Sequence, residues 1–233
     1  MTREEYLERV DGAKNIVFFG GAGVSTESGI PDFRSVDGLY SQKYAVQPET
    51  ILSHDYFFEH TEEFFKFYFD KMICRDAQPN AAHAKLAEWE RNGKLSAVVT
   101  QNIDGLHQKA GSERVFELHG STLRNRCIEC GRKYSLDEIM EFAPNVPRCR
   151  CGGVIKPDVV LYGEMLPQKA VEGALDAIEN ADMLIVGGTS LSVYPAAGLV
   201  RYFHGKRENL IVINMTRIGG FDNQLNGRIG ELL

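Results

Sequence analysis

Short runs of consecutive apolar residues recur along the chain, and each ends at or beside a glycine or a polar residue. Four of them cover residues 15–20, 95–100, 183–187 and 210–214, and residues 115–118 are a candidate for a fifth. Unbroken apolar runs of this length are typical of strands that are buried on both faces. We therefore predict a parallel sheet whose strands have neither face in water.

Segments with helix end signals lie between these runs. Pro79 opens an alanine-rich stretch that Gly93 closes, Pro167 opens a second segment, and Pro195 opens a third that ends near Gly205. Proline favours the first turn of a helix, and glycine favours the position just past its end. Strands that alternate with helices predict an α/β fold with a doubly wound, Rossmann-like parallel sheet and helices on both faces.

Two segments interrupt the alternation. Residues 36–75 hold clustered aromatic residues on nearly all sides of a predicted helix, which favours core packing over a ligand role. Residues 124–157 are rich in cysteine and turns, and the segment is too short to build a core without a cross-link such as a bound metal. We expect the two insertions to pack together as a small domain. Residues 1–35, 76–123 and 158–233 would then form the large domain, with a cleft between the two.

Four of the five cysteines form two close pairs in the second insertion. The pattern is C-x2-C, eighteen intervening residues and C-x-C, made by Cys127, Cys130, Cys149 and Cys151. Four thiolates satisfy the tetrahedral preference of Zn²⁺ and leave no open position, so we predict one structural zinc ion. The basic residues around them can offset the negative charge of the site, and a nucleic-acid contact is the less favoured alternative. The fifth cysteine, Cys74, is predicted to be a buried apolar residue.

Composition narrows the class of protein further. The chain has 233 residues, 43% of them hydrophobic, and a net charge of -6, which argues against a nucleic-acid partner for the surface as a whole. No apolar run is long enough for a membrane span, and the first residues lack the apolar core of a signal peptide. We therefore expect a cytoplasmic protein without a membrane partner, in a compartment where paired cysteines more often bind metal than form disulfides.

A glycine-rich turn follows the first predicted strand. Gly21, Ala22, Gly23, Ser25 and Thr26 could cradle a pyrophosphate at a helix start. The dinucleotide pattern is incomplete because Thr26 stands at the third glycine position, and no acidic ribose ligand follows at the usual spacing. From the turn alone, a tight connection without a ligand remains an open alternative.

Several longer motifs carry a family resemblance. They are Gly-Ala-Gly-Val-Ser at 21–25, Gly-Ile-Pro-Asp-Phe-Arg at 29–34, Thr-Gln-Asn-Ile-Asp-Gly-Leu-His at 100–107, Glu-Leu-His-Gly at 117–120, the four cysteines, Tyr-Gly-Glu at 162–164 and Gly-Thr-Ser-Leu-Ser-Val-Tyr-Pro-Ala at 188–196. Their order along nearly the whole chain resembles that of the sirtuins. The resemblance implies an NAD-dependent protein-lysine deacetylase that consumes NAD as a co-substrate, acts on acylated lysine side chains of proteins and is a monomer.

The same resemblance implies the chemistry and the residues that perform it. In sirtuins the acyl oxygen attacks the ribose carbon that bears nicotinamide, and a histidine then acts as base on a ribose hydroxyl. Here His119 matches the catalytic base and Asn102 would assist it by holding the ribose. The matching NAD contacts are Gly21, Ala22, Gly23, Ser25, Thr26, Asp32, Phe33, Arg34, Gln101, Asn102, Ile103, Asp104, His119, Gly188, Thr189, Ser190, Asn214 and Met215.

The substrate side of the site also follows from the resemblance. The peptide would pair with Val160, Leu161, Tyr162 and Gly163, where main-chain bonds give little sequence preference. Tyr68 and Lys71 match a Tyr–Arg pair of sirtuins that remove succinyl groups. Lysine lacks the two-pronged grip of arginine on a carboxylate, so we expect acetyl to be preferred. A protein ADP-ribosyltransferase, a deacylase for succinyl or longer groups, and a non-enzymatic zinc-ribbon binding module are the alternatives.

Overall fold

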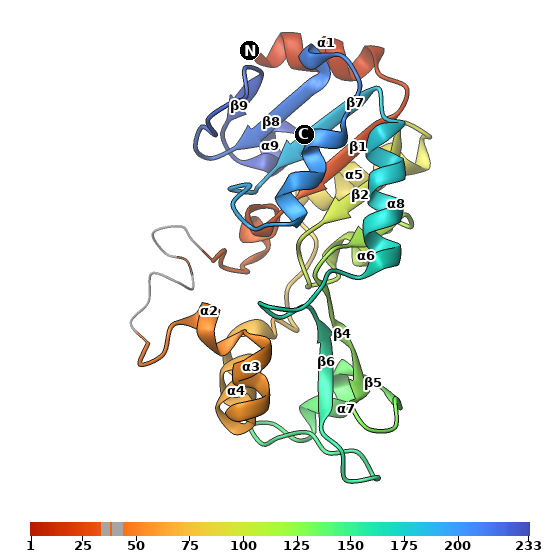
Figure 1. Cartoon of the computed structure of the whole chain (residues 1–233). Coiled ribbons are helices and arrows are strands. Elements are labelled where there is room, and N and C mark those ends of the chain that lie inside the picture. Colours follow the sequence, from red (N-terminus) through yellow and green to blue (C-terminus); the bar gives the residue numbers. More distant parts are fainter. Residues whose placement is uncertain (34–37, 39–43) are drawn as a thin grey trace.

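The computed structural model describes residues 1–33, 38 and 44–233. Its larger lobe holds a six-stranded sheet with the order β3-β2-β1-β7-β8-β9, and every neighbouring pair is parallel (Figure 1). The strands are β1 (Ile16–Gly20), β2 (Leu95–Thr100), β3 (Val115–Glu117), β7 (Met183–Gly187), β8 (Leu210–Asn214) and β9 (Gln224–Asn226). The strand order reverses between β1 and β7, and open α/β sheets bind ligands at the carboxyl end of such a switch point.

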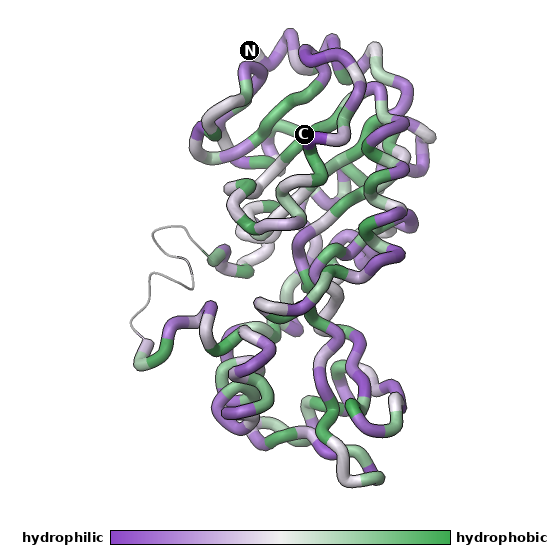
Figure 2. The backbone as a smooth tube through the Cα atoms, in the orientation of Figure 1, coloured by the Kyte–Doolittle hydropathy of each residue, from purple (hydrophilic) through white to green (hydrophobic). Residues whose placement is uncertain are grey.

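Helices cover both faces of this sheet, as the apolar runs predict. One core contains Tyr6 of α1 (Arg3–Gly12), Leu86 of α5 (Ala81–Arg91) and Ile229 of α9 (Ile229–Leu232). The core on the other face contains Ile178 of α8 (Gln168–Glu179) and Leu199 of the 3-10 helix η5 (Ala196–Tyr202). All five residues of β1 and of β7 are buried, and hydrophobic residues run along the strands in Figure 2. The α/β, doubly wound prediction is confirmed.

The smaller lobe combines residues from the two insertions. Its helical part consists of α2 (Pro48–Ile51), α3 (His54–Glu59), α4 (Thr61–Phe67) and the π-helical turn η4 (Tyr68–Met72). Its other part is an antiparallel sheet with the order β5 (Lys133–Ser135), β4 (Gly120–Cys127) and β6 (Ile155–Val159). Helix α7 (Leu136–Met140) directly follows β5 in the chain. One core joins the aromatic residues of the first part to Cys127 and Ile155 of the second.

Strands β4 and β6 run from the large lobe into the small lobe (Figure 1). Each of them crosses an expected domain boundary, because β4 spans residues 123 and 124 and β6 spans residues 157 and 158. The remaining connections contain α6 (Leu106–Ala110) and the 3-10 turns η1 (Ala22–Val24), η2 (Thr26–Ser28) and η6 (Arg207–Asn209). Among the described residues, no helix has the length and apolar character needed to span a membrane.

Some expectations about single elements differ from the structure. The third predicted helix is the 3-10 helix η5, and β9 was not predicted, because a three-residue strand with two polar residues gives no apolar run. Cys74 is exposed rather than buried, so that prediction is wrong. The cysteine follows the end of η4, in the connection to α5, and therefore does not share the packed face of the aromatic helices.

Two histidines lie side by side in the interior of the large lobe. His83 of α5 and His107 of α6 are at most 1% exposed, and their ring centroids are 4.7 Å apart. No described residue hydrogen-bonds to either ring nitrogen of His107. Burial, and to a lesser degree the neighbouring His83, lowers the pKa of His107 to about 3. The ring is therefore neutral in the folded protein throughout the physiological range.

This burial predicts a loss of stability in mild acid. The unfolded chain protonates His107 near pH 6.5, whereas the folded protein does not until about pH 3, so the unfolded state gains protons first as the pH falls. The stability that depends on the neutral ring is complete above pH 6.5 and is lost below it. Between pH 7.5 and 5.5 the contribution of this residue to the free energy of unfolding should fall by about 1.4 kcal/mol.

Urea unfolding at the two pH values measures the effect. The His107→Leu variant is the matched control, because it removes the titrating ring and keeps the other acid-sensitive groups. Its free energy of unfolding should change less between the two pH values than that of the wild type. Equal pH dependence of the two proteins would contradict the assignment, whatever the absolute stability of the variant.

Candidate active site

A large cleft opens at the carboxyl ends of the parallel strands and extends to the small lobe. Its volume is about 1890 Å³, and it is lined by the glycine-rich turn, the segments after β2, β7 and β8, and residues 159–164. Every predicted NAD and peptide contact lines it except Arg34 and Tyr68. Arg34 lies outside the described residues.

Tyr68 lies inside the aromatic core of the small lobe instead. It is 1% exposed and stacks on Phe64 with a centroid distance of 5.7 Å. Its predicted partner Lys71 does line the cleft, where its ammonium group is 3.0 Å from the Asp70 carboxylate. The structure therefore does not bring Tyr68 and Lys71 together as a pair of cleft residues, and a contact of Tyr68 with the acyl group stays a prediction.

The glycine-rich turn packs closely against the segment after β7. The turn is made of the short 3-10 helices η1 and η2 rather than the start of an α-helix. The Gly23 N–H donates to the Gly188 carbonyl at 2.8 Å, and a Cβ atom on Gly23 would lie 2.9 Å from the same oxygen. Glycine is therefore required for packing here, and the turn lines the cleft as well.

Side chains from three different loops form hydrogen bonds across the floor of the cleft. Ser25 donates from Oγ to the Asp104 carboxylate at 2.7 Å and accepts from Nδ2 of Asn102 at 3.0 Å. Gln101 donates from Nε2 to Oγ1 of Thr189 at 3.0 Å. Ser25 is 1% exposed and Asn102 is 8% exposed, so these bonds are largely shielded from water. They hold the predicted NAD contacts in one arrangement, which suits a preorganised binding site.

The orientation of His119 leaves one ring nitrogen available as a base. Its Nδ1 lies 2.9 Å from the Gln101 carbonyl oxygen, which can only accept a hydrogen bond. Nδ1 therefore carries the proton, and in the neutral ring the lone pair is on Nε2. Burial lowers the pKa of His119 below its usual value, and the bond to Gln101 partly opposes this shift. The ring is thus neutral at pH 7 and lines the cleft as a proton acceptor.

The predicted substrate segment bridges His119, the predicted catalytic base, and the small lobe. The Val160 N–H donates to the His119 carbonyl at 2.9 Å. Two residues further on, the Tyr162 N–H donates to the Leu52 carbonyl, and the His54 N–H donates to the Tyr162 carbonyl, each at 2.9 Å. Residues 160–162 are therefore fixed to both lobes next to His119.

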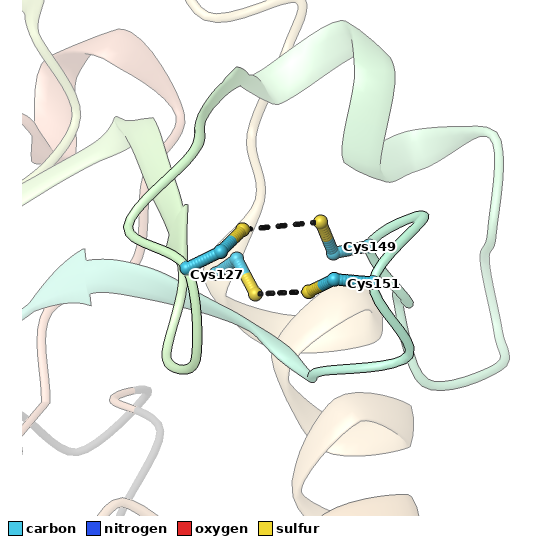
Figure 3. Close-up of side chains that lie close together, drawn as sticks. Cys127, Cys149 and Cys151 are labelled. Atoms are coloured by element: carbon cyan, nitrogen blue, oxygen red, sulfur yellow. Dashed lines mark hydrogen bonds between the residues drawn. The ribbon is translucent and has the colours of Figure 1, made fainter.

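The four cysteines converge at the far end of β4 and β6 (Figure 3). Their sulfur atoms all lie within 4.8 Å of one another, with 3.5 Å between Cys127 and Cys151 and 3.6 Å between Cys130 and Cys149. Four sulfurs placed about 2.3 Å from a tetrahedral Zn²⁺ would be about 3.8 Å apart. The thiols therefore fit a structural zinc ion, in agreement with the sequence prediction.

Among the described residues, the cleft is also lined by four basic residues that the sequence did not single out, which are Arg75, Lys109, Arg217 and Arg228. Arg217 lies three residues beyond β8, and Arg228 lies two residues beyond β9. Both could meet the phosphates of a bound dinucleotide. The position of each just after a parallel strand was the available signal, but β9 was too short to be recognised.

Comparison with known proteins agrees with this geometry. The Sir2 family model matches residues 21–195. An NAD-dependent protein deacetylase of Clostridium acetobutylicum is 54% identical over 228 residues, which cover 95% of this chain and 92% of that protein. One of Clostridium perfringens is also 54% identical, with 97% and 94% covered.

Solved structures of Sir2 proteins are also similar to this chain. A structure of Sir2 with a p53 peptide and NAD⁺ has a TM-score of 0.87 and 37% identity, and covers 99% of this chain and 95% of that one. Sir2 bound to an acetylated peptide has a TM-score of 0.86 and 36% identity with the same coverage. The family model covers most of the chain, and the two relatives are more than half identical over nearly their full length. This chain therefore belongs to the Sir2 family.

Proposed function

We propose that this protein is an NAD-dependent protein-lysine deacetylase. It transfers the acetyl group from acetyl-lysine to the ADP-ribose part of NAD and releases nicotinamide. The observation that carries the proposal is the position of His119, which lines the same cleft as the hydrogen-bonded loops of the predicted NAD site and whose Nδ1 is bonded to the Gln101 carbonyl, so that Nε2 can act as the base. The curated relatives and the Sir2 structures with peptide and NAD⁺ support it.

The residues of the cleft have separate tasks in this reaction. NAD, when bound, supplies a ribose carbon that becomes reactive as nicotinamide leaves. His119 accepts a proton at Nε2 from a ribose hydroxyl, and the Gln101 carbonyl stabilises the charged ring through its bond to Nδ1. Asn102 and Gln101 hold the reacting ribose, Ser25 belongs to the turn that cradles the pyrophosphate, and Asp104 accepts from the nicotinamide amide. The backbone at residues 160–163 binds the peptide that carries the acetyl-lysine.

The rest of the molecule supports this cleft. We propose that residues 36–75 and 124–157 act as one small domain beside the NAD-binding domain, since they share a core. The zinc ion supplies only structural stability, because four thiolates leave no open coordination position. The net charge of -6 supports a protein partner rather than nucleic acid. We further propose a monomer that works in the cytoplasm.

Acetyl is the preferred acyl group in this proposal. Tyr68 is buried and Lys71 pairs with Asp70, so the two side chains do not form a joint site for a second carboxylate. A succinyl group would have to compete with Asp70 for the lysine. The smaller neutral acetyl group needs no such partner.

The test is incubation of the protein with NAD and matched acetylated and succinylated peptides. We expect nicotinamide, deacetylated peptide and O-acetyl-ADP-ribose in equal amounts, and a slower reaction with the succinyl peptide. Mass spectrometry separates the alternatives, because an ADP-ribosyltransferase adds ADP-ribose to a protein and leaves the acetyl group in place. Absence of nicotinamide release would overturn the proposal.

A further inference from the structure

One arginine at the junction of the lobes contacts two acidic residues close to the predicted catalytic histidine, one on β3 and one on β6. Arg124 of β4 places its guanidinium 2.8 Å from the Glu117 carboxylate. Its Nε donates to the Asp158 carboxylate at 3.4 Å. Glu117 is the last residue of β3 in the large lobe, and Asp158 lies in β6. The side chain of Arg124 therefore links the three strands that surround His119.

The backbone explains why a side chain is needed at this point. The β4–β6 ladder pairs Ser121 with Asp158 and Asn125 with Pro157, so β4 carries three extra residues between the two pairs. Arg124 belongs to this bulge, which has no ladder partner on β6. Bulges beside active sites commonly redirect a side chain, and here the side chain restores a contact between β4 and β6 that the backbone has lost.

The burial of Glu117 makes this ion pair different from an ordinary surface pair. The side chain of Glu117 is only 10% exposed, whereas that of Arg124 is 53% exposed. Among the described residues, Arg124 is the only cation that contacts the Glu117 carboxylate. Exposed pairs contribute little, but a largely shielded carboxylate that loses its only cationic partner is drawn toward water. Such a movement would displace the chain two residues before His119.

The segment around His119 is also held by its neighbours, and the Gln101 carbonyl fixes the ring at Nδ1. The Leu118 N–H donates to the Thr100 carbonyl, and the His119 carbonyl accepts from Val160, both at 2.9 Å. Gly120 is pressed against β6, because a Cβ atom there would lie 1.9 Å from the Asp158 carbonyl oxygen. A shift of Glu117 or Asp158 would thus reach the imidazole and the substrate segment at once.

We propose that Arg124 is a positioning residue for deacetylation, which acts by holding Glu117 and Asp158 so that His119 and residues 160–162 keep their relative places. The inference rests on the proposed deacetylase function. Arg124 itself does not line the cleft, and it acts through the two carboxylates. Catalysis by a base depends steeply on position, and a displacement of about 1 Å can cost up to about 100-fold in rate.

The variants Arg124→Gln and Arg124→Lys test this role with the full-length zinc-loaded protein. Arg124→Gln removes the charge and both ion pairs and should lower kcat about tenfold. Its KM for NAD and for acetylated peptide should change by less than about threefold, since the binding residues stay in place. Arg124→Lys should recover part of kcat, because an ammonium can pair with one carboxylate but not grip both.

The matched control is Arg114→Gln. Arg114 is similarly exposed, directly precedes β3 and forms one ion pair, with Asp176 at 3.5 Å. Its replacement should leave kcat, zinc content and the unfolding midpoint at wild-type values. The Glu117→Gln variant adds a second measurement, because its loss of kcat and that of Arg124→Gln should be non-additive in the double variant.

The outcomes separate this inference from the proposed function. A wild-type protein without deacetylase activity would overturn the function. An active wild type with an equally active Arg124→Gln variant would overturn the positioning role alone. The positioning role would also be overturned if the loss of kcat only matched a loss of folded, zinc-containing protein. The same holds if the loss of kcat in Arg124→Gln and that in Glu117→Gln were additive in the double variant.

Discussion

Replacement of His119 by alanine is expected to lower the rate of deacetylation by about 10²- to 10⁴-fold, the usual contribution of a general base. The Gln101 carbonyl fixes the proton of the neutral imidazole on Nδ1, so that Nε2 can accept a proton. Alanine removes the acceptor without filling its place. The measurement is kcat with saturating NAD and acetylated peptide.

Folding should survive this replacement. His119 is only partly buried, and its ring forms one hydrogen bond, so the loss should cost about 0.5–1.5 kcal/mol of stability. The His204→Ala variant is the control, since His204 is exposed and does not line the cleft. It should keep wild-type kcat. A His119→Ala protein that deacetylates at a rate close to wild type would show that the base is a different group.

Replacement of Cys127 by alanine is expected to release the zinc ion and to lower the free energy of unfolding by several kcal/mol. Three thiolates cannot close the tetrahedral shell, and Cys127 is itself 1% exposed within the core of the small lobe. The metal joins the turn after β4 to the turn before β6, and both strands lead back to the active site. Deacetylation should therefore fall with the zinc content.

Zinc content by metal analysis and urea unfolding measure this effect. Cys74→Ala provides the matched control, because Cys74 is exposed and lies outside the four-sulfur cluster. It should retain one zinc ion per chain and wild-type stability. If the Cys127→Ala protein also kept one zinc ion per chain, the four-thiolate assignment would be wrong.

Four strands of the large lobe could be predicted because they lie in the interior, between two layers of helices. A strand covered by helices on both faces needs apolar residues at successive positions, so β1, β2, β7 and β8 appear as continuous runs. β9 lies at the edge of the sheet with one apolar residue, and this local signal is too weak. The exposure of Cys74 was missed for a related reason, since the end of the aromatic helix depends on packing rather than on composition.

The residues of the candidate site also differ in whether the sequence alone could predict them. The zinc ligands follow from spacing, because two short Cys pairs are sufficient to define a tetrahedral set. The predicted role of His119 follows from the motif around it, and nearly all of the NAD and peptide contacts that the motifs name line the cleft. In contrast, nothing in the local sequence around Tyr68 distinguishes a residue that faces the cleft from one that stacks on Phe64. That difference depends on which side of the helix meets the core.

The amino-acid sequence by itself therefore determined the class of sheet and the metal ligands, because both depend on residue types at short spacing, whereas the prediction of His119 as the base came from the family motif around it. Only the tertiary structure decided how these parts meet. Ser25 and Asp104 are 79 positions apart, and Arg124 and Asp158 are 34 positions apart. Such contacts depend on the order of strands in the sheet and on a bulge in β4. Neither leaves a periodic trace in the sequence, because both arise only when distant segments pack.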